Sequence, residues 1–214
     1  MTTNRGRLVA LEGIDGCGKS TLTRLLVERL GLGSELAPVA TFEPGATPLG
    51  ASLRSLLLGR DGAPVAPRAE ALLMAADRAQ HVADVIAPAL ESGRWVVTDR
   101  YSASTLAYQG YGRGLDLMEL GAIVDWANGG LRPDLTILLD LPVAVAAARR
   151  GGEGDDRMEA EGLAFQQRVA DGFLALAVSG PDPWLVVDAT DPVELVADTV
   201  WAAIAVLAGP GGPP

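Results

Sequence analysis

A glycine-rich loop that ends in a lysine and two hydroxyl residues lies near the start of the chain. Its residues follow the spacing G-x-x-x-x-G-K-[ST] and are Gly13, Ile14, Asp15, Gly16, Cys17, Gly18, Lys19, Ser20 and Thr21. Glycines at these positions let backbone N–H groups converge on phosphate oxygens at the positive end of the following helix. We therefore expect this loop to bind a nucleoside triphosphate, with Lys19 on its β and γ phosphates and Ser20 on Mg²⁺.

Two charged residues of this loop differ in how well they suit a phosphate. Lys19 is the only lysine of the chain, and every other basic side chain except the single histidine is an arginine. A compact ammonium suits a nest of converging N–H groups better than a planar guanidinium does. Asp15 would be repelled by a phosphate unless its carboxylate faces away from it. We expect Asp15 to point toward a metal-bound water or a sugar hydroxyl of a second ligand.

A second group of polar residues follows the apolar run that ends at Asp99. A carboxylate at the end of a strand beside a phosphate loop can orient Mg²⁺ or its water shell, and this is the role that we expect for Asp99. The adjacent Arg100 is suited to bidentate contact with a phosphate. The alternative is that Asp99 caps the next helix and that Arg100 is incidental.

Three arginines, Arg149, Arg150 and Arg157, flank a segment that contains three glycines. Such a segment predicts a flexible cationic lid, at about 149–159, that closes on a transferring phosphoryl group, excludes water and neutralises developing charge. The alternative is a solvated loop in which Arg149 and Arg150 only complement the negative end of a helix.

Five short apolar runs predict the strands that position these groups, at about 7–12, 38–43, 95–99, 135–140 and 184–188. Apolar strands that alternate with helical segments favour an α/β fold, with a five-stranded parallel sheet flanked by helices in the three-layer P-loop NTPase-type architecture. Each run ends in a carboxylate: Glu12, Glu43, Asp99, Asp140 and Asp188. Several of these acids should line one crevice, because ligands bind at the carboxyl ends of such strands. Asp140 and Asp188 have a plainer alternative, in which they cap the next turn or helix.

A long helical segment is predicted over about 67–91. Met74, Arg78 and His81 share one face of it, beside apolar residues. An arginine in this position needs a partner. It either forms a surface salt bridge with Asp77 or Glu70, which would contribute little to stability, or faces a ligand.

Composition narrows the class of protein. A length of 214 residues fits one domain, which we expect to span 1–214 with a disordered Gly/Pro-rich tail at about 209–214. A single cysteine excludes an intrachain disulfide, and a single histidine excludes a zinc site of ordinary ligand spacing. The formal charge of −10 argues against a nucleic-acid surface, and the apolar runs are too short for a membrane span. We expect a cytoplasmic protein.

Taken together, these segments resemble the thymidylate kinase family, in the bacterial form whose arginine-rich lid follows the fourth strand. The resemblance extends from Leu8 to about Val200, and its pieces are residues 12–21, 42–47, 76–81, 99–110 and 156–159. The phosphate loop alone is shared by many functions. The Asp-Arg-Tyr and Ala-Tyr-Gln-Gly pieces of 99–110, together with Ala-Asp-Arg-Ala-Gln-His at 76–81, are specific to the family.

The resemblance implies a reaction. The protein would transfer the γ-phosphoryl group of Mg·ATP to dTMP, giving dTDP and ADP in dTTP biosynthesis. It would act as a homodimer formed through helices, with no nucleic-acid or membrane partner. Positioning and charge stabilisation suffice for this chemistry, so no catalytic histidine is required.

The resemblance also implies roles for individual residues. The catalytic set is Lys19, Arg100, Arg149, Arg150 and Arg157, with Glu159 beside the last. The phosphate loop, residues 13–21, would bind ATP, and the segment 189–192 would lie against adenine. Ser20 and Asp99 would hold the metal. The dTMP-binding set is Asp15, Glu43, Met74, Arg78, Arg100, Ser104, Thr105, Tyr108 and Gln109.

The resemblance matches individual residues of the dTMP-binding set to the base, the sugar or the phosphate of the nucleotide. Arg78 matches the family's arginine on the thymine carbonyl, while Ser104 and Thr105 lie where side chains approach the pyrimidine edge. Tyr108 matches the tyrosine under the deoxyribose. Asp15 matches the acid near the 3′-hydroxyl, and Arg100 matches the arginine on the acceptor phosphate.

The chain departs from the family pattern at two positions. Met74 stands where a phenylalanine commonly stacks on thymine, and we expect a thioether there to preserve binding with altered strength. Phe42 stands where many bacterial members have an arginine. The loss of that cation makes Arg100 more important for the acceptor phosphate.

Three rival functions remain to be weighed. Another nucleoside or nucleotide kinase would differ only in its acceptor base. A regulatory GTPase is disfavoured because no Asn-Lys-x-Asp sequence occurs in the chain. A catalytically silent nucleotide-binding module is disfavoured by the presence of Lys19, Ser20, Asp99 and Arg157.

Overall fold

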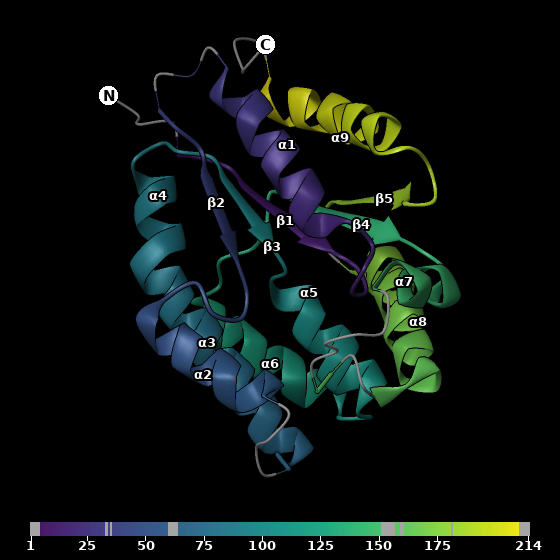
Figure 1. Ribbon diagram of the computed structural model, residues 1–214. Helices are drawn as coiled ribbons and strands as arrows, with labels where there is room; N and C mark the ends of the chain where they lie inside the picture. Colours follow the sequence, from purple (N-terminus) through teal and green to yellow (C-terminus); the bar gives the residue numbers. More distant parts are fainter. Residues whose placement is uncertain are drawn as a thin grey trace.

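A parallel β-sheet forms the centre of the molecule (Figure 1). The computed structural model describes residues 5–32, 34, 36–59, 64–150, 157–158, 161–180 and 182–209. The strands are β1 (Leu8–Glu12), β2 (Val39–Phe42), β3 (Val96–Asp99), β4 (Leu135–Asp140) and β5 (Trp184–Asp188). They pair in parallel in the order β2-β3-β1-β4-β5. The predicted α/β fold with a five-stranded parallel sheet is confirmed.

The strand bounds agree closely with the sequence prediction. β4 and β5 begin and end at the predicted residues, and the other three strands are shorter by one residue at one or both ends. The central strand β1 lies between β3 and β4. The chain forms β2 and β3 on one side of β1, and then crosses over to form β4 and β5 on the other side. This reversal places the phosphate loop, which follows β1, at the position where ligands of open α/β sheets bind.

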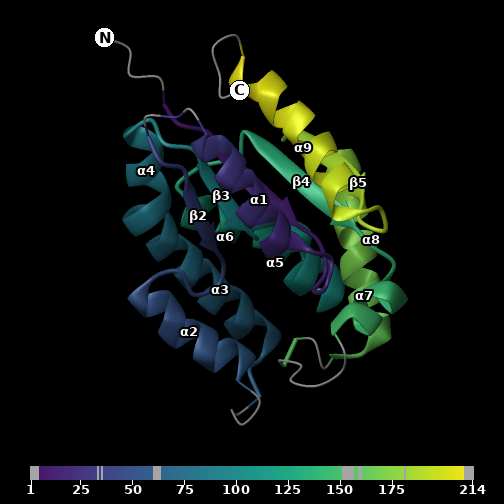
Figure 2. The ribbon, with the colours of Figure 1, turned by 45° about the horizontal axis from the view of Figure 1, so that its top comes forward.

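Helices cover both faces of the sheet. They are α1 (Lys19–Gly31), α2 (Pro48–Leu58), α3 (Pro67–His81), α4 (Ala87–Glu91), α5 (Ser102–Thr105), α6 (Leu117–Asn128), α7 (Val143–Arg150), α8 (Leu163–Ser179) and α9 (Val193–Ala208). Two π-helical segments, η1 (Val82–Ile86) and η2 (Leu106–Gly112), continue α3 and α5. Helices α1 and α9 lie side by side in both views (Figures 1 and 2).

Alternation along β1 explains why both faces need a cover. Val9 and Leu11 belong to a buried cluster that includes Leu22 and Leu26 of α1. Leu8 and Ala10 belong to a second cluster, which includes residues of η1 and α4. Successive side chains of a strand point to opposite faces, so one apolar run serves both clusters.

The segment 67–91 is helical throughout, as predicted, but it is not a single α-helix. The π-helical turn η1 separates α3 from α4, and Pro88 stands in the first turn of α4. Proline has no N–H to donate to the carbonyl four residues earlier, and a π-helical turn is one way to accommodate that break. Within the described parts of the chain, no helix combines the length and the apolar character that crossing a membrane requires.

Candidate active site

The phosphate loop joins β1 to α1 in a backbone conformation that needs glycine. Gly13, Gly16 and Gly18 all have positive φ, at 137°, 86° and 101°. A Cβ atom at Gly13 would lie 2.7 Å from the carbonyl oxygen of Leu139. The side chains of Ile14 and Cys17 are buried in the core, so any contact of these two residues with a phosphate would be made by their backbone.

Lys19 lies at the first position of α1, with its ammonium folded back over the loop. Nζ donates hydrogen bonds to the carbonyl oxygens of Gly13 and Ile14, both at 3.1 Å. Asp15 Oδ1 lies 3.8 Å from the same ammonium. These hydrogen bonds hold the Lys19 ammonium above the loop. A phosphate bound in the loop would therefore lie next to a positive charge that is already in place.

The two residues expected to hold the metal are in direct contact. Ser20 Oγ donates to Asp99 Oδ2 at 2.8 Å, and both side chains border the cavity that contains Lys19. A hydroxyl and a carboxylate beside phosphates are the oxygen donors that Mg²⁺ prefers, and Mg²⁺ keeps several waters when it binds such a site. The donor set therefore fits Mg²⁺. Among the described residues, no group of three or more His, Cys, Asp or Glu side chains forms a separate metal cage.

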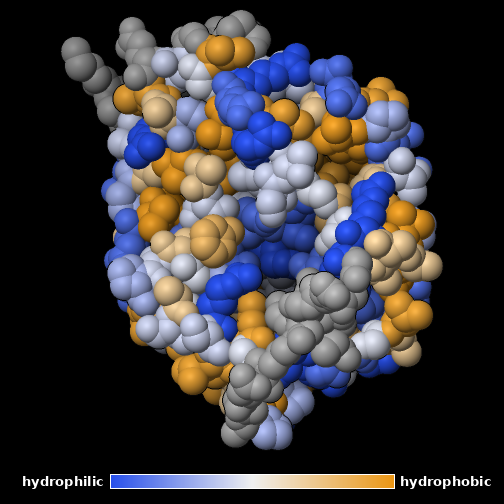
Figure 3. All heavy atoms as spheres, in the orientation of Figure 1, coloured by the Kyte–Doolittle hydropathy of each residue, from blue (hydrophilic) through white to orange (hydrophobic). Residues whose placement is uncertain are grey.

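Two adjoining cavities open at the carboxyl ends of the strands, and hydrophilic residues line the hollow near the centre of this face (Figure 3). We call them the loop cavity and the inner cavity. The loop cavity is lined by Lys19, Ser20, Thr21, Asp99 and Arg149, among others. The inner cavity is lined by every residue of the expected dTMP-binding set: Asp15, Glu43, Met74, Arg78, Arg100, Ser104, Thr105, Tyr108 and Gln109. Asp15, Glu43, Arg54 and Arg100 border both cavities, and so form the wall between them.

Arg100 is the centre of that wall. Nη1 donates to the carbonyl oxygen of Gly13 and to Ser104 Oγ, both at 3.0 Å. Nη2 forms an ion pair with Asp15 and donates to the Tyr108 hydroxyl at 3.0 Å. The Tyr108 hydroxyl in turn donates to Asp15 Oδ2 at 3.0 Å. Burial opposes the ionisation of Asp15, but the charges of Arg100 and Lys19 hold its pKa well below the usual range.

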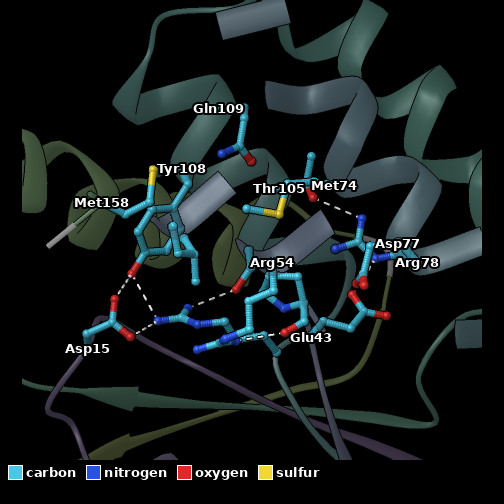
Figure 4. Close-up of a pocket in the computed structure, with 14 residues that line it drawn as sticks. Asp15, Glu43, Arg54, Met74, Asp77, Arg78, Thr105, Tyr108, Gln109 and Met158 are labelled. Atoms are coloured by element: carbon cyan, nitrogen blue, oxygen red, sulfur yellow. Dashed lines mark hydrogen bonds and ion pairs between the residues drawn. The ribbon is translucent and has the colours of Figure 1, made fainter. Parts of the chain in front are cut away.

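Arg78 lies on the opposite side of the inner cavity from Asp15 and Tyr108 (Figure 4). Its partner is Glu43, so neither of the two partners considered from sequence, Asp77 and Glu70, is the right one. Nε donates to Glu43 Oε2 at 2.8 Å, Nη1 to Thr105 Oγ1 at 2.9 Å, and Nη2 to a backbone carbonyl. The ion pair is buried, with side-chain exposures of 3% and 4%.

Glu43 also anchors the single histidine. His81 Nδ1 lies 2.9 Å from Glu43 Oε1, and His81 Nε2 lies 2.6 Å from Thr41 Oγ1. Asp77 accepts a hydrogen bond from the Gly45 N–H nearby. Burial, together with the charge of Glu43, raises the pKa of Asp77 to about 6. Glu43 therefore links Arg78 to a buried polar network at the wall of the inner cavity.

The lid arginines are divided between two places. Arg150 Nη1 donates to the carbonyl oxygen of Asp15 at 2.8 Å, and Arg149 Nη2 donates to the carbonyl oxygen of Ala189 at 3.1 Å. Arg150 therefore contacts the phosphate loop directly, and Arg149 lines the loop cavity together with Gly16, Gly18 and Lys19. Arg157 instead pairs with the buried Glu70, at 2.9 Å, on α3. Glu159, the glycines that Arg150 and Arg157 flank, and the tail 210–214 lie outside the described residues.

Some residues of the site were missed from sequence. Arg54 borders both cavities and donates to the carbonyl oxygen of Pro44 at 2.7 Å. It is the only charged residue of α2, and this isolation in an apolar helix was the available signal. Leu58 and Met158 also line the inner cavity. Asp188 caps a turn through two hydrogen bonds from Thr190, which matches the plainer alternative considered for it.

Comparison with known proteins agrees with this geometry. Residues 11–200 match the profile of the family described as Thymidylate kinase. The chain is 48% identical over 206 residues to the thymidylate kinase of Alkalilimnicola ehrlichii, covering 94% of this chain and 93% of that protein. It is 53% identical over 194 residues to that of Synechococcus sp. strain CC9902, covering 88% and 92%. A crystal structure of thymidylate kinase from Ehrlichia chaffeensis matches with a TM-score of 0.76 and 30% identity, over 94% of this chain and 99% of that one. The chain belongs to the thymidylate kinase family.

Proposed function

We propose that the protein transfers the γ-phosphoryl group of ATP to dTMP and releases dTDP and ADP. The observation that carries this proposal is the shared wall of the two cavities, which contains the Asp15–Arg100 ion pair. A donor in the loop cavity and an acceptor in the inner cavity would meet at this wall. Direct transfer between them needs no covalent enzyme intermediate.

The loop cavity would hold ATP. Backbone N–H groups of residues 13–21 would surround its phosphates, and the Lys19 ammonium, which now rests on two loop carbonyls, would neutralise charge on the β and γ phosphates. Ser20 and Asp99 would hold Mg²⁺ and its waters. The ion would neutralise charge that develops on the transferring group.

The inner cavity would hold dTMP. Arg100 would bind its phosphate and Asp15 its 3′-hydroxyl, while Tyr108 packs against the deoxyribose. Arg78 and Thr105 already share a hydrogen bond at the opposite side, where the thymine would lie, with Ser104 and Gln109 along its edge. Met74 would supply the apolar contact to the base, and Glu43 would keep Arg78 in place.

Arg149 and Arg150 would stabilise charge on the transferring phosphoryl group from the side of the loop. Arg150 donates to the Asp15 carbonyl of the loop, and Arg149 lines the loop cavity while it donates to the Ala189 carbonyl. Arg157 would act there only after leaving Glu70, to which it is paired 2.9 Å away.

Transfer of labelled phosphate tests this function. The full-length protein, incubated with γ-³²P-ATP, Mg²⁺ and dTMP, should produce labelled dTDP in a one-to-one ratio with ADP. Omission of dTMP should abolish most ADP formation. Label that appears chiefly as inorganic phosphate, at the same rate with and without dTMP, would rule the proposal out.

We also propose a homodimer that works in the cytoplasm. Exposed apolar side chains on α3 and α6 support the dimer: Leu72, Met118 and Trp126 are 57%, 82% and 84% exposed. The single cysteine suits a reducing compartment. Sedimentation of the wild type and of Trp126→Glu checks the interface. A dimer is expected for the former and a weakened dimer for the latter, whereas a wild-type monomer would disprove it.

A further inference from the structure

Glu12 is a buried carboxylate for which the proposed reaction has no use. It ends β1, directly before the phosphate loop, and its exposed fraction is 0%. A carboxylate in such a place is unfavourable unless hydrogen bonds and charges compensate for its lost hydration. The groups that donate hydrogen bonds to the Glu12 carboxylate show which segment of the chain it fixes in place.

Among the described residues, the hydrogen-bond donors to Glu12 all belong to the segment after Arg100. Oε1 accepts from the N–H of Tyr101 at 3.0 Å and from the N–H of Ser104 at 3.2 Å. Oε2 accepts from Ser104 Oγ at 2.6 Å. One carboxylate therefore fixes the turn that joins β3 to α5.

The residue just before this turn has an unusual backbone. Arg100 is the only described residue other than glycine with a positive φ, at 74°. This left-handed conformation is unfavourable for a side chain with a Cβ atom, so its neighbours must hold it. The N–H of Arg100 donates to the carbonyl of Leu11 at 2.8 Å, and its own carbonyl accepts from Thr98 Oγ1 at 2.8 Å. Glu12 supplies the anchor on the following side, through Tyr101.

Ser104 extends this anchor from the backbone of Arg100 to its guanidinium. The Ser104 hydroxyl accepts from Arg100 Nη1 at 3.0 Å. It has only one hydrogen, and the 2.6 Å contact assigns that hydrogen to Glu12. The negative charge of Glu12 therefore orients the hydroxyl so that its lone pairs face Arg100. The resulting chain runs from Glu12 through Ser104 to Arg100, at the wall between the two cavities.

We propose that Glu12 is a positioning residue that, through Ser104 and the Tyr101 N–H, aims Arg100 at the phosphate of the nucleoside monophosphate acceptor. This role rests on the proposed function, because it takes Arg100 to be the acceptor-phosphate cation. It predicts that Glu12 affects binding of the acceptor and leaves binding of ATP nearly unchanged. Glu12 itself touches neither substrate.

The proposed role of Glu12 should depend on pH, because it relies on the negative charge of the carboxylate. Burial raises its pKa to about 7, although Ser104, Arg100, Tyr101 and Arg78 act in the opposite direction. The two cations that lower it are Arg100 and Arg78. Glu12 is therefore ionised above neutral pH and largely neutral below pH 6, so its hold on Arg100 should strengthen as pH rises.

Glu12→Gln removes the charge and keeps the shape. Its amide oxygen can still accept from the Tyr101 and Ser104 N–H groups, so the fold should persist. We expect the dTMP dissociation constant, measured by calorimetry, and the KM for dTMP to rise about 10- to 100-fold at pH 8.5, as for loss of a charge-assisted hydrogen bond. The KM for ATP should change less than about twofold. Ser104→Ala should act in the same direction, and Ser102→Ala, two residues away on the same helix, should match the wild type.

The ratio of variant to wild-type dTMP dissociation constants provides the pH test. This ratio should fall toward one near pH 5.5, where Glu12 is protonated. The titration of the dTMP phosphate does not affect the ratio, because it acts equally on the variant and on the wild type. In an Arg100→Gln background, Glu12→Gln should add less than about twofold, because its effect passes through Arg100.

Equal increases in the KM for dTMP and for ATP would overturn the proposal, as would a pH-independent ratio or the same effect in the Arg100→Gln background. Failure of the proposed function would look different. In that case the wild type itself would neither bind dTMP nor phosphorylate it, before any variant is compared.

Discussion

Replacement of Arg78 by alanine should reveal both the buried ion pair and the dTMP site. Arg78 is 2% exposed and donates three hydrogen bonds, one of them to Glu43 at 2.8 Å. Its removal leaves the carboxylate of Glu43, which is 5% exposed, without its guanidinium partner. Breaking a buried pair in this way costs about 3–5 kcal/mol of the free energy of unfolding.

The size of that loss makes it easy to measure. For a domain of this length, about 3–5 kcal/mol corresponds to a decrease in Tm of roughly 6–20 °C. Arg24→Ala is a suitable control, because its pair with Glu28 is exposed, at 63% and 60%, and should contribute less than about 1 kcal/mol. Adding Glu43→Gln to Arg78→Ala should recover part of the loss, because the stranded charge is then gone.

Kinetics complete this test. The KM for dTMP should rise at least about 10-fold in Arg78→Ala, while the KM for ATP stays within about twofold, because Arg78 lines only the inner cavity. An unchanged Tm would refute the energetic reasoning. Equal increases in both KM values would refute the placement of thymine at Arg78.

Other changes should separate the two cavities and the buried acids. Lys19→Ala should lower kcat by on the order of 10²-fold or more, because it removes a cation from the transferring phosphates; an unchanged kcat in a steady-state assay would exclude that role. Met74→Phe should tighten dTMP binding in calorimetry by stacking on the base, and weaker binding would mean that residue 74 does not face thymine. The third change is Asp77→Asn. The pKa of the Asp77 carboxyl is raised to about 6, so the folded state binds a proton there more tightly than the unfolded state does. Wild-type stability from this group is therefore lost as pH rises from about 4 to 6, and the variant should be more stable by about 1–2 kcal/mol at pH 8 but not at pH 3. A pH-independent difference in chemical denaturation would contradict that sign.

Much of the fold could be predicted because its signals are local. The phosphate loop is a contiguous motif, and each strand lies within an apolar run that ends in an acid. The strand bounds were therefore correct to within one residue at each end. The π-helical turns were not predicted, because each is a single short insertion in a helical segment, of five residues in η1 and seven in η2, and a change of period is not resolved over so few residues.

The parts that could not be predicted depend on contacts between distant segments. Arg78 pairs with Glu43, 35 residues away in the sequence, and not with the acids on its own helix. Arg157 pairs with Glu70, 87 residues away in the sequence. Arg54 lies in the site because this residue of α2 contacts Pro44 and Gly45, in the loop after β2. Composition and periodicity carry no information on such pairings, because they arise only when the elements pack.

The most direct test of the proposed function is a comparison of acceptors. The full-length protein with ATP and Mg²⁺ should form ADP with dTMP at a kcat/KM at least about 10-fold higher than with dCMP, AMP or GMP, since a site built to hydrogen-bond one base rejects the others. Coupled measurement of ADP, with product identity checked by chromatography, gives this ratio. Equal kcat/KM for dTMP and any of the other three would contradict the assignment of the inner cavity to thymidylate.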